Sequence, residues 1–330
     1  MNSHQIPSPH CRQILLLVAC ICLWGCQAPL NLHKQSKSNH HMGMAEKYLD
    51  RSLTDAALAA FGLALEENPR VTDAHMGMGD IYRLYGNYEL ASRAYERATY
   101  IDPNHFSAHY YLALMSQMLG RLDEAITTYL KALAIDPRSF EANRDITAAY
   151  LQLGQMTLAV RYAERATELS PDSQESWTNL AAAYSLQGRY NESVNAYRQA
   201  AEQGSLNDRV LLGLANAHIR LGNYPRAINV LNSLIHREPS STAYERLGYA
   251  NFKQREFRQA LKNFQMSLSL VENDTAALNG VGVCLMTLYI QGGRENLIQR
   301  NQAVGAWRKS VQLRPDQPRI VDLISRYKRM

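Results

Sequence analysis

The sequence predicts an all-α fold built from stacked helical hairpins. Three series of residues support this prediction because they repeat with one common period of 34 residues. A repeat of this length accommodates two helices and their turns, and each such unit buries its apolar face only against its neighbours. The glycine series is Gly86, Gly120, Gly154, Gly188 and Gly222; the second is Ala57, Ala91, Ala125, Ala159, Ser193 and Ala227; the third is Pro69, Pro103, Pro137 and Pro171, with Pro239 two periods later.

The segment 104–137 shows what one period contains. Apolar and small residues recur at spacings of three and four on both sides of Gly120, as one face of a helix requires. Glycine suits the end of the first helix, where it adopts the left-handed conformation that satisfies the last carbonyls. Pro137 ends the second helix and begins the next unit. Each period is therefore a helix-turn-helix hairpin.

The residues within the period resemble those of the tetratricopeptide repeat. Small residues stand where two helices approach, and large ones fill the gap toward the next hairpin. The resemblance implies a right-handed superhelical solenoid of about eight repeats over residues 42–315, with a capping helix at 316–330. One unit shows the pattern in Trp177, Leu180, Ala181, Tyr184, Ser193, Tyr197 and Ala200, and another in Met78, Gly79, Tyr82, Ala91, Tyr95, Ala98 and Pro103.

Composition and net charge limit the classes of function that this protein can have. The 330-residue chain is 46% hydrophobic and 20% charged, which is typical of a folded protein. Its net charge of +5 is mild for this length and lacks the concentrated basic footprint of a nucleic-acid binder. We therefore expect no nucleic-acid partner.

Residues 1–25 are interpreted as a lipoprotein signal peptide. Arg12 supplies a positive charge before the apolar run 14–24, whose eleven residues are too few to span a bilayer, which takes roughly 20. The run ends in Leu-Trp-Gly-Cys, which resembles the lipobox of bacterial lipoproteins apart from Trp24, where a small residue is usual. The resemblance implies lipidation of Cys26, with Gln27 favouring the outer membrane facing the periplasm. An ordinary signal peptide with an incidental cysteine is the alternative.

Residues 26–41 are expected to form a flexible tether, because they are polar and lack periodicity. His33, His40 and His41 lie in it without a third well-spaced ligand, so no metal site is predicted. The last cysteine, Cys284, lies in an apolar helical stretch and is expected to be a small buried hydrophobe.

The C-terminal units depart from the common register. Gly248 and Ala260 arrive one residue early, and an insertion within 287–302 separates Gly282 from Ala303. The insertion is interpreted either as a tolerated loop or lengthened helix pair, or as a partner contact. The segment 318–329 places apolar residues on one helix face, as a solubilising cap requires.

No catalytic motif, phosphate loop or cofactor fingerprint is present, so we expect a non-enzymatic protein without cofactors. The family resemblance implies a concave groove formed by the first helix of each hairpin, with a protein or extended peptide as partner. Three of the predicted groove residues, Arg144, Asn179 and Arg209, resemble part of the carboxylate clamp of chaperone-binding tetratricopeptide domains, but Ala148 and Gly213 occupy its other two positions. The predicted groove residues are Arg83, Tyr110, Arg144, Asn179, Arg209, Asn216, Arg220, Arg246, Tyr249 and Lys253.

The sequence thus favours a lipid-anchored scaffold that mediates protein–protein interaction in a bacterial cell envelope. One alternative is a pilotin-like assembly factor for pilus or secretin machinery. Another is an accessory subunit of a glycosyltransferase or polysaccharide export system, which clustered aromatic groove residues would favour.

Overall fold

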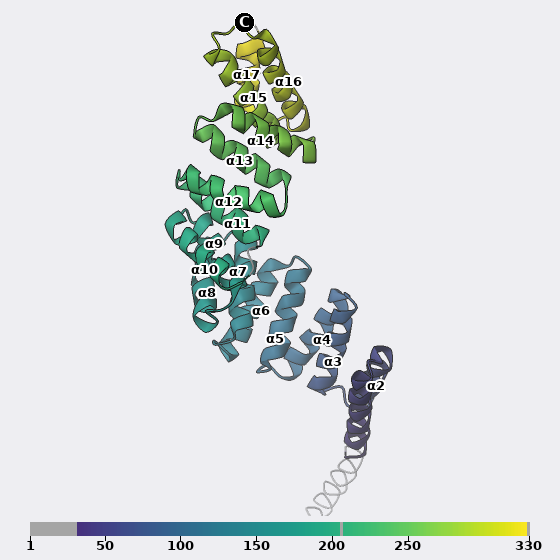
Figure 1. The fold of residues 1–330 in the computed structure, drawn as a ribbon. Coiled ribbons are helices and arrows are strands. Elements are labelled where there is room, and N and C mark those ends of the chain that lie inside the picture. The colour runs from purple at the N-terminus through teal and green to yellow at the C-terminus, as the bar shows by residue number, and fades with distance from the viewer. Residues whose placement is uncertain (1–31, 205–206, 329–330) are drawn as a thin grey trace, which may run out of the picture. The chain divides into compact units, whose positions relative to one another are not determined.

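The computed structural model describes residues 32–204 and 207–328, and every regular element in those ranges is an α-helix (Figure 1). Consecutive helices pack as antiparallel hairpins joined by short turns, as the 34-residue period predicts. A helix over residues 32–50 precedes the labelled ones. Those are α2 (Thr54–Glu67), α3 (Thr72–Leu84), α4 (Tyr88–Ile101), α5 (Phe106–Met118), α6 (Leu122–Ile135), α7 (Phe140–Leu153), α8 (Met156–Leu169), α9 (Gln174–Leu186), α10 (Tyr190–Glu202), α11 (Asp208–Arg220), α12 (Tyr224–Arg237), α13 (Ser241–Lys253), α14 (Phe257–Leu270), α15 (Thr275–Gln291), α16 (Leu297–Leu313) and α17 (Pro318–Lys328).

The chain divides into two compact units, and the division falls within α7, between Ala149 and Tyr150. The first unit contains the hairpins up to α6 and most of α7. The second contains the last turn of α7 and the helices from α8 to α17. Each unit is described by itself below.

The turn glycines behave as the sequence predicts. All five members of the series have φ between 71° and 79°, the left-handed region that side chains with a Cβ rarely adopt. In the hairpin α13–α14 the same turn lacks glycine, and Arg255 takes the conformation instead, with φ of 65°. The main-chain geometry of the turn is therefore kept even where its usual residue is absent.

In the hairpins α3–α4 and α15–α16, a glycine of the first helix packs against an aromatic ring of the second. In α3, a Cβ at Gly79 would lie 2.5 Å from the ring of Tyr95, which is fully buried. In α15, a Cβ at Gly282 would lie 2.2 Å from the indole of Trp307, which is 1% exposed. These glycines are needed for close approach, because real Cβ atoms do not come so near a ring.

The N-terminal boundary differs from the sequence-based prediction. Residues 32–41, expected to belong to a flexible tether, are the first part of a helix that pairs with α2. Ser38 is fully buried there and its hydroxyl donates to the carbonyl of Ala64 at 2.9 Å. Asn68 Nδ2 donates to Gln35 Oε1 at 2.9 Å. The expected signal peptide, Cys26 and the rest of the tether lie outside the described residues.

The insertion within 287–302 lengthens two helices. Both α15 and α16 have 17 residues, whereas α13 has 13 and α14 has 14. The interpretation as a lengthened helix pair is therefore correct. Beyond it, α17 packs Ile320, Leu323, Ile324 and Tyr327 against the core of α15 and α16, as a capping helix should.

Among the described residues, no helix is both long and apolar enough to cross a bilayer. The same residues contain no group of three His, Cys, Asp or Glu side chains placed to hold a metal ion. Cys284 is buried, and burial raises the pKa of its thiol to about 12, which keeps it protonated near neutral pH.

Gly282→Ala tests the glycine–aromatic packing. We expect it to lower the free energy of unfolding by about 1–3 kcal/mol, because the new methyl group forces Trp307 to move in a filled core. Thermal unfolding followed by circular dichroism measures the change. Gly305 in α16 is the matched control, since it is exposed and a Cβ there meets no atom within 4 Å. Gly305→Ala should raise stability by about 0.4–1 kcal/mol. Equal shifts in both variants would contradict the packing account.

Candidate functional site

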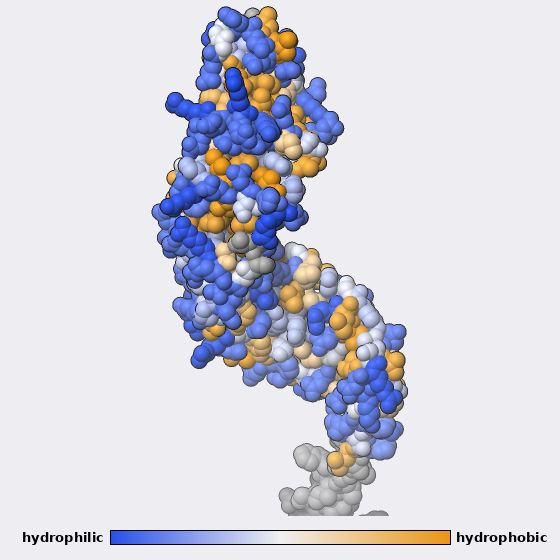
Figure 2. Space-filling view, viewed as in Figure 1, coloured by the Kyte–Doolittle hydropathy of each residue, from blue (hydrophilic) through white to orange (hydrophobic). Residues whose placement is uncertain are grey.

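The first helices of successive hairpins in the second unit lie against one another. Helix α9 contacts α11, α11 contacts α13, and α13 contacts α15, whereas the second helices α10, α12, α14 and α16 form no contacts of that extent among themselves. Helices that converge in this way form a continuous wall. We call the surface formed by α9, α11, α13 and α15 the first-helix wall. The visible face of this unit carries apolar patches between polar ones (Figure 2).

The first hollow in the wall joins α9 and α10 to α11 and α13. Its volume is about 370 Å³. Arg220 closes one side by donating from Nε and Nη2 to the hydroxyl oxygen of Tyr190, at 2.9 and 2.6 Å. The guanidinium carbon also lies 5.2 Å from the centre of that ring, a cation–π arrangement. The hollow is lined by Ser185, Leu186, Tyr190, Asn216, Ile219, Arg220 and Arg246.

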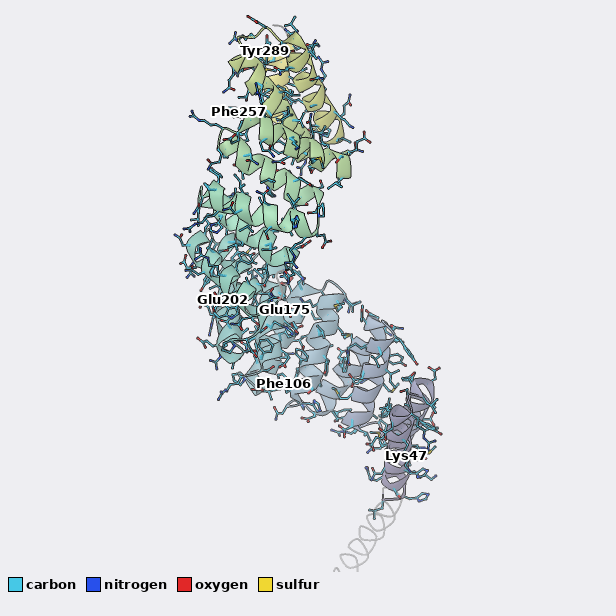
Figure 3. All side chains as sticks on the ribbon, in the orientation of Figure 1. Lys47, Phe106, Glu175, Glu202, Phe257 and Tyr289 are labelled. Carbon is cyan, nitrogen blue, oxygen red and sulfur yellow. The ribbon has the colours of Figure 1, made fainter. Side chains whose placement is uncertain are left out.

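The second hollow lies between α13 and α15 and has a volume of about 310 Å³. Most of its lining is apolar. The ring of Phe252, on α13, packs against the ring of Phe257 with 5.2 Å between their centres. Phe257, at the start of α14, and Tyr289, on α15, are labelled in Figure 3. Lys253 holds its ammonium nitrogen 5.6 Å from the centre of the Tyr249 ring. The lining residues are Glu245, Tyr249, Phe252, Lys253, Phe264, Ala276, Asn279, Gly280 and Val283.

Helix α13 connects the two hollows. Arg246 lines the first, while Tyr249 and Lys253 line the second. The spacing of three and then four residues keeps them on one face of the helix. Seven residues of helix span about 10 Å, which is the length of roughly three residues of extended chain. A single extended segment can therefore reach both hollows.

Glu245 is the acidic group of the second hollow. Its side chain is only 12% exposed and lies 3.3 Å from Arg246 Nε. Burial raises the pKa of its carboxyl group and the negative charge of Asp274 adds to the rise, while Arg246 opposes it. The carboxylate is thus kept in an environment that disfavours its charge.

Five of the ten predicted groove residues line these hollows: Asn216, Arg220, Arg246, Tyr249 and Lys253. Two further ones, Asn179 and Arg209, lie on α9 and α11 but outside the hollows. Asn179 is 3% exposed, and its amide oxygen accepts a hydrogen bond from Arg209 Nη2 at 2.8 Å. Asn179 therefore holds Arg209 and does not face the groove, in contrast to its prediction as a groove residue.

The remaining three predicted residues belong to the first unit and take part in a network of internal contacts. Tyr110 donates to Asp145 Oδ2 at 2.8 Å, and Arg144 Nε donates to the other oxygen of that carboxylate at 2.7 Å. Burial, helped by Asp145, raises the pKa of Tyr110. Arg83 lies 5.2 Å from the centre of the Tyr111 ring and 3.5 Å from Asp80. These groups mainly hold neighbouring hairpins in place.

Sequence reasoning missed Tyr190, Asn279 and Gly280. Tyr190 comes from a second helix, which the expectation of a wall of first helices leaves out. The other two had a signal in the sequence: they stand 34 residues after Glu245 and Arg246, so the repeat itself places them at equivalent positions. The period could have extended the predicted wall to α15.

Comparisons with known proteins agree with this architecture. Profiles of the tetratricopeptide repeat match residues 148–173, 162–195 and 184–248, and a TPR repeat profile matches 79–120 and 118–154. Together these segments run without a gap from 79 to 248 and cover more than half of the chain. The repeats of stacked hairpins are thus tetratricopeptide repeats, and the chain is a tetratricopeptide repeat protein. No curated protein sequence matches it significantly.

Solved structures share the fold at low sequence identity. A tetratricopeptide repeat protein from Parabacteroides merdae is 18% identical, with a TM-score of 0.53, covering 76% of this chain and 99% of its own. The pilF protein of Pseudomonas aeruginosa is 19% identical, with a TM-score of 0.52, and the match covers 68% of this chain and 98% of pilF. The Cut9–Hcn1 hetero-tetramer of the APC/C is 16% identical, with a TM-score of 0.55, and the match covers 90% of this chain and 56% of that one. At these identities the likeness concerns the fold alone.

Glu245→Gln tests the electrostatics of the second hollow. With its pKa raised on folding, Glu245 contributes stability that is present at low pH and lost as the pH rises through its folded-state pKa. The neutral glutamine avoids that loss. We expect the variant to be more stable than wild type at about pH 7, and the difference to shrink as the pH falls toward about 4. Thermal unfolding across this range measures it.

Glu272→Gln is the control for this prediction. The hydrogen bond from Lys309 and that group's charge lower the pKa of Glu272, so the pH dependence has the opposite sign. If Glu272→Gln gained as much stability at neutral pH as Glu245→Gln, the effect would come from the removal of any acidic charge and not from the burial of Glu245.

Proposed function

We propose that this chain is a non-enzymatic scaffold that binds an extended segment of a partner protein along the first-helix wall of its second unit. The observation that supports this most directly is the pair of hollows joined by α13. Three cations, Arg220, Arg246 and Lys253, line them, and Glu245 is the acidic residue among the lining side chains. Such a surface favours a segment with acidic side chains, because arginine pairs with carboxylates through fixed, parallel hydrogen bonds.

The partner's main chain has its own recognition group in this proposal. Asn216 lies on α11 between Arg220 and Arg209 in sequence and lines the first hollow. An amide side chain offers both a donor and an acceptor, so it can bond to the N–H and C=O of an extended backbone. Arginine and asparagine together would hold an acidic segment in one register.

The cellular setting is a second part of the proposal. We propose that Cys26 is lipidated and anchors the scaffold in the outer membrane of a bacterial envelope, facing the periplasm. The support is the sequence at the end of the apolar run, Leu-Trp-Gly-Cys followed by glutamine. Acylation by more than one chain would provide stable anchoring.

The alternatives differ in what is bound. A pilotin-like assembly factor would bind a subunit of pilus or secretin machinery, which is one case of a protein partner. An accessory subunit of a polysaccharide system would present aromatic faces to sugar rings. In the first unit, Tyr110 and Tyr111 pack edge to face against each other at 5.1 Å, which favours a structural role for them. A protein partner is therefore the better supported choice.

Reversal of the wall's charge is the test of partner binding. A photo-reactive amino acid at position 186, on the rim of the first hollow, should crosslink the partner in intact cells. The same amino acid at position 266, an exposed site on α14, should not. Arg220→Glu with Arg246→Glu should reduce the crosslinked product roughly a hundredfold, because charge-assisted hydrogen bonds contribute about 1.5–3 kcal/mol each.

The control carries the same charge change on the second helix of a hairpin. Arg258 and Lys262 are exposed on α14, and Arg258→Glu with Lys262→Glu should leave the crosslinked product unchanged. Equal crosslinking from positions 186 and 266, or equal loss in both charge variants, would refute binding along the first-helix wall.

Cys26→Ser tests the anchor. We expect the variant to stay unprocessed and to lose its covalent lipid, detected by metabolic labelling with a clickable fatty acid. Gly305→Ala, made in a region distant from the apolar run in sequence, should label as wild type does. Wild-type chain without incorporated fatty acid would contradict the lipoprotein proposal.

A further inference from the structure

The lengthened hairpin α15–α16 ends in a tip that exposes large aliphatic side chains. We call residues 290–298 the hairpin tip. Ile290, near the end of α15, is 41% exposed, and Leu297 and Ile298, the first two residues of α16, are 52% and 70% exposed. The turn of the preceding hairpin, at 254–256, is Gln-Arg-Glu and has no such side chains. The exposed apolar surface therefore comes with the inserted residues.

The fold of the tip does not require these side chains. Its turn is made by the main chain, with φ of 73° at Gly293 and 65° at Arg294, and the Arg294 N–H donates to the carbonyl of Tyr289 at 2.9 Å. Asn296 caps α16 through its side chain. None of the three aliphatic residues belongs to the core of α15, α16 and α17. Adjacent exposed aliphatic residues that serve no packing indicate a contact surface.

The same part of the chain carries its excess positive charge. The segment 275–328, which forms α15, α16 and α17, has eight Lys and Arg and three Asp and Glu, a net charge of +5. The whole chain also has a net charge of +5, so the remaining sequence is balanced, with 27 basic and 27 acidic residues. A uniformly solvated surface would not need this concentration. The end of the solenoid thus attracts anions over a distance that the rest of the chain does not.

Most of these cations are available to an external anion. Two of the eight form ion pairs within the described chain, and Arg300 donates to the amide oxygen of Asn301 at 3.2 Å, which leaves its charge unneutralised. Arg294 lies in the hairpin tip and Arg300 lies two residues beyond it, so positive charge flanks the aliphatic side chains. The five exposed cations that form no ion pair with a described residue are Arg294, Arg308, Arg314, Arg319 and Lys328.

We propose that the hairpin tip inserts into the surface of a bilayer that contains anionic lipids. The aliphatic side chains enter the boundary between headgroups and acyl chains, while Arg294 and Arg300 bond to phosphate oxygens. A bilayer accepts aliphatic area without matching its shape, whereas the residues that dominate protein interfaces are Trp, Tyr and Arg, with Leu under-represented. The cations of α16 and α17 add attraction to the anionic surface. This contact goes beyond the proposed anchor at Cys26, because it belongs to the folded part of the chain.

The test uses the purified full chain and lipid vesicles. An environment-sensitive fluorescent amino acid replaces Ile298 in one preparation and Leu313, at the other end of α16, in a second. The vesicles contain phosphatidylglycerol brominated on its acyl chains, which quenches fluorophores inside the bilayer. We expect quenching at position 298 to be at least roughly threefold that at position 313, because an inserted face lies about 5–10 Å into the bilayer. Attachment through the apolar run 14–24 would not by itself quench position 298. Equal quenching at both positions, or none at 298, would overturn the proposal.

Ile290→Ser with Leu297→Ser, made in the chain with the probe at 298, tests the apolar contact. We expect the equilibrium constant for insertion to fall at least about tenfold, because less apolar area is removed from water. Leu270→Ser with Val271→Ser is the matched control, since these residues are 49% and 50% exposed outside the hairpin tip. It should leave the quenching unchanged. A similar effect of both double variants would overturn insertion of the tip.

Arg294→Glu with Arg300→Glu tests the requirement for anionic lipid. We expect insertion to weaken roughly thirtyfold or more, since each cation near an anionic surface contributes about tenfold or somewhat less. Vesicles of brominated phosphatidylcholine alone should quench position 298 as weakly in the wild-type chain. Arg258→Glu with Lys262→Glu, the same charge change on α14, should have a much smaller effect, and circular dichroism confirms that the variants fold. Insertion into phosphatidylcholine as strong as into phosphatidylglycerol would overturn the proposal.

The wall variant separates this inference from partner binding. Arg220→Glu with Arg246→Glu should remove the crosslink from position 186 but retain the quenching at position 298. Quenching that is lost in this variant and retained in Arg294→Glu with Arg300→Glu would show that the first-helix wall, and not the hairpin tip, contacts the lipid, and would overturn the inference. If position 186 forms no crosslink while position 298 is quenched as expected, the proposed function is wrong and the lipid contact stands.

Discussion

The close approach of the two helices in each hairpin is the constraint on which the rest of the structure depends. Where Gly79 meets Tyr95, and where Gly282 meets Trp307, the absence of a side chain on one helix makes room for a ring on the other. That contact sets the distance between the helices and buries the ring almost completely. In the second unit the first helices α9, α11, α13 and α15 contact one another in turn, so their remaining faces form the first-helix wall.

The wall illustrates how a scaffold separates folding from recognition. On α13, Leu247 and Gly248 are buried in the packing, while Arg246 and Tyr249 on either side face outward. Substitution of the outward residues leaves the hairpin intact, so the chemistry of the wall can vary independently of the fold. Gly280 is an exception, since it lines the second hollow and also packs against the ring of Phe264.

Much of the fold could be predicted from the sequence, because turn glycines and small packing residues leave a strict period. The helix over residues 32–50 could not, since its early part is polar and its one fully buried residue before Ala45 is Ser38. Periodicity of apolar residues does not detect a helix that packs through a serine hydroxyl. In the candidate site, Tyr249 and Lys253, which the sequence predicts as groove residues, line the second hollow. Asn179 does not face the groove as predicted. A helical face is about 100° wide, so a position at its edge can be covered by a neighbouring side chain. Here Arg209 covers Asn179 and donates a hydrogen bond to it.

The bond between Gln317 and Asn279 connects the end of the solenoid to its interior surface. Gln317 immediately precedes α17, and its amide is held by the last turn of α16 and the loop that follows. The capping helix thus does more than cover the apolar face of the last hairpin: the segment leading into it fixes the orientation of the Asn279 amide, whose residue lines the second hollow. Loss of the cap would remove the acceptor that holds this amide and leave it free to rotate. The lining of the second hollow thus depends on a residue, Gln317, that does not itself line it.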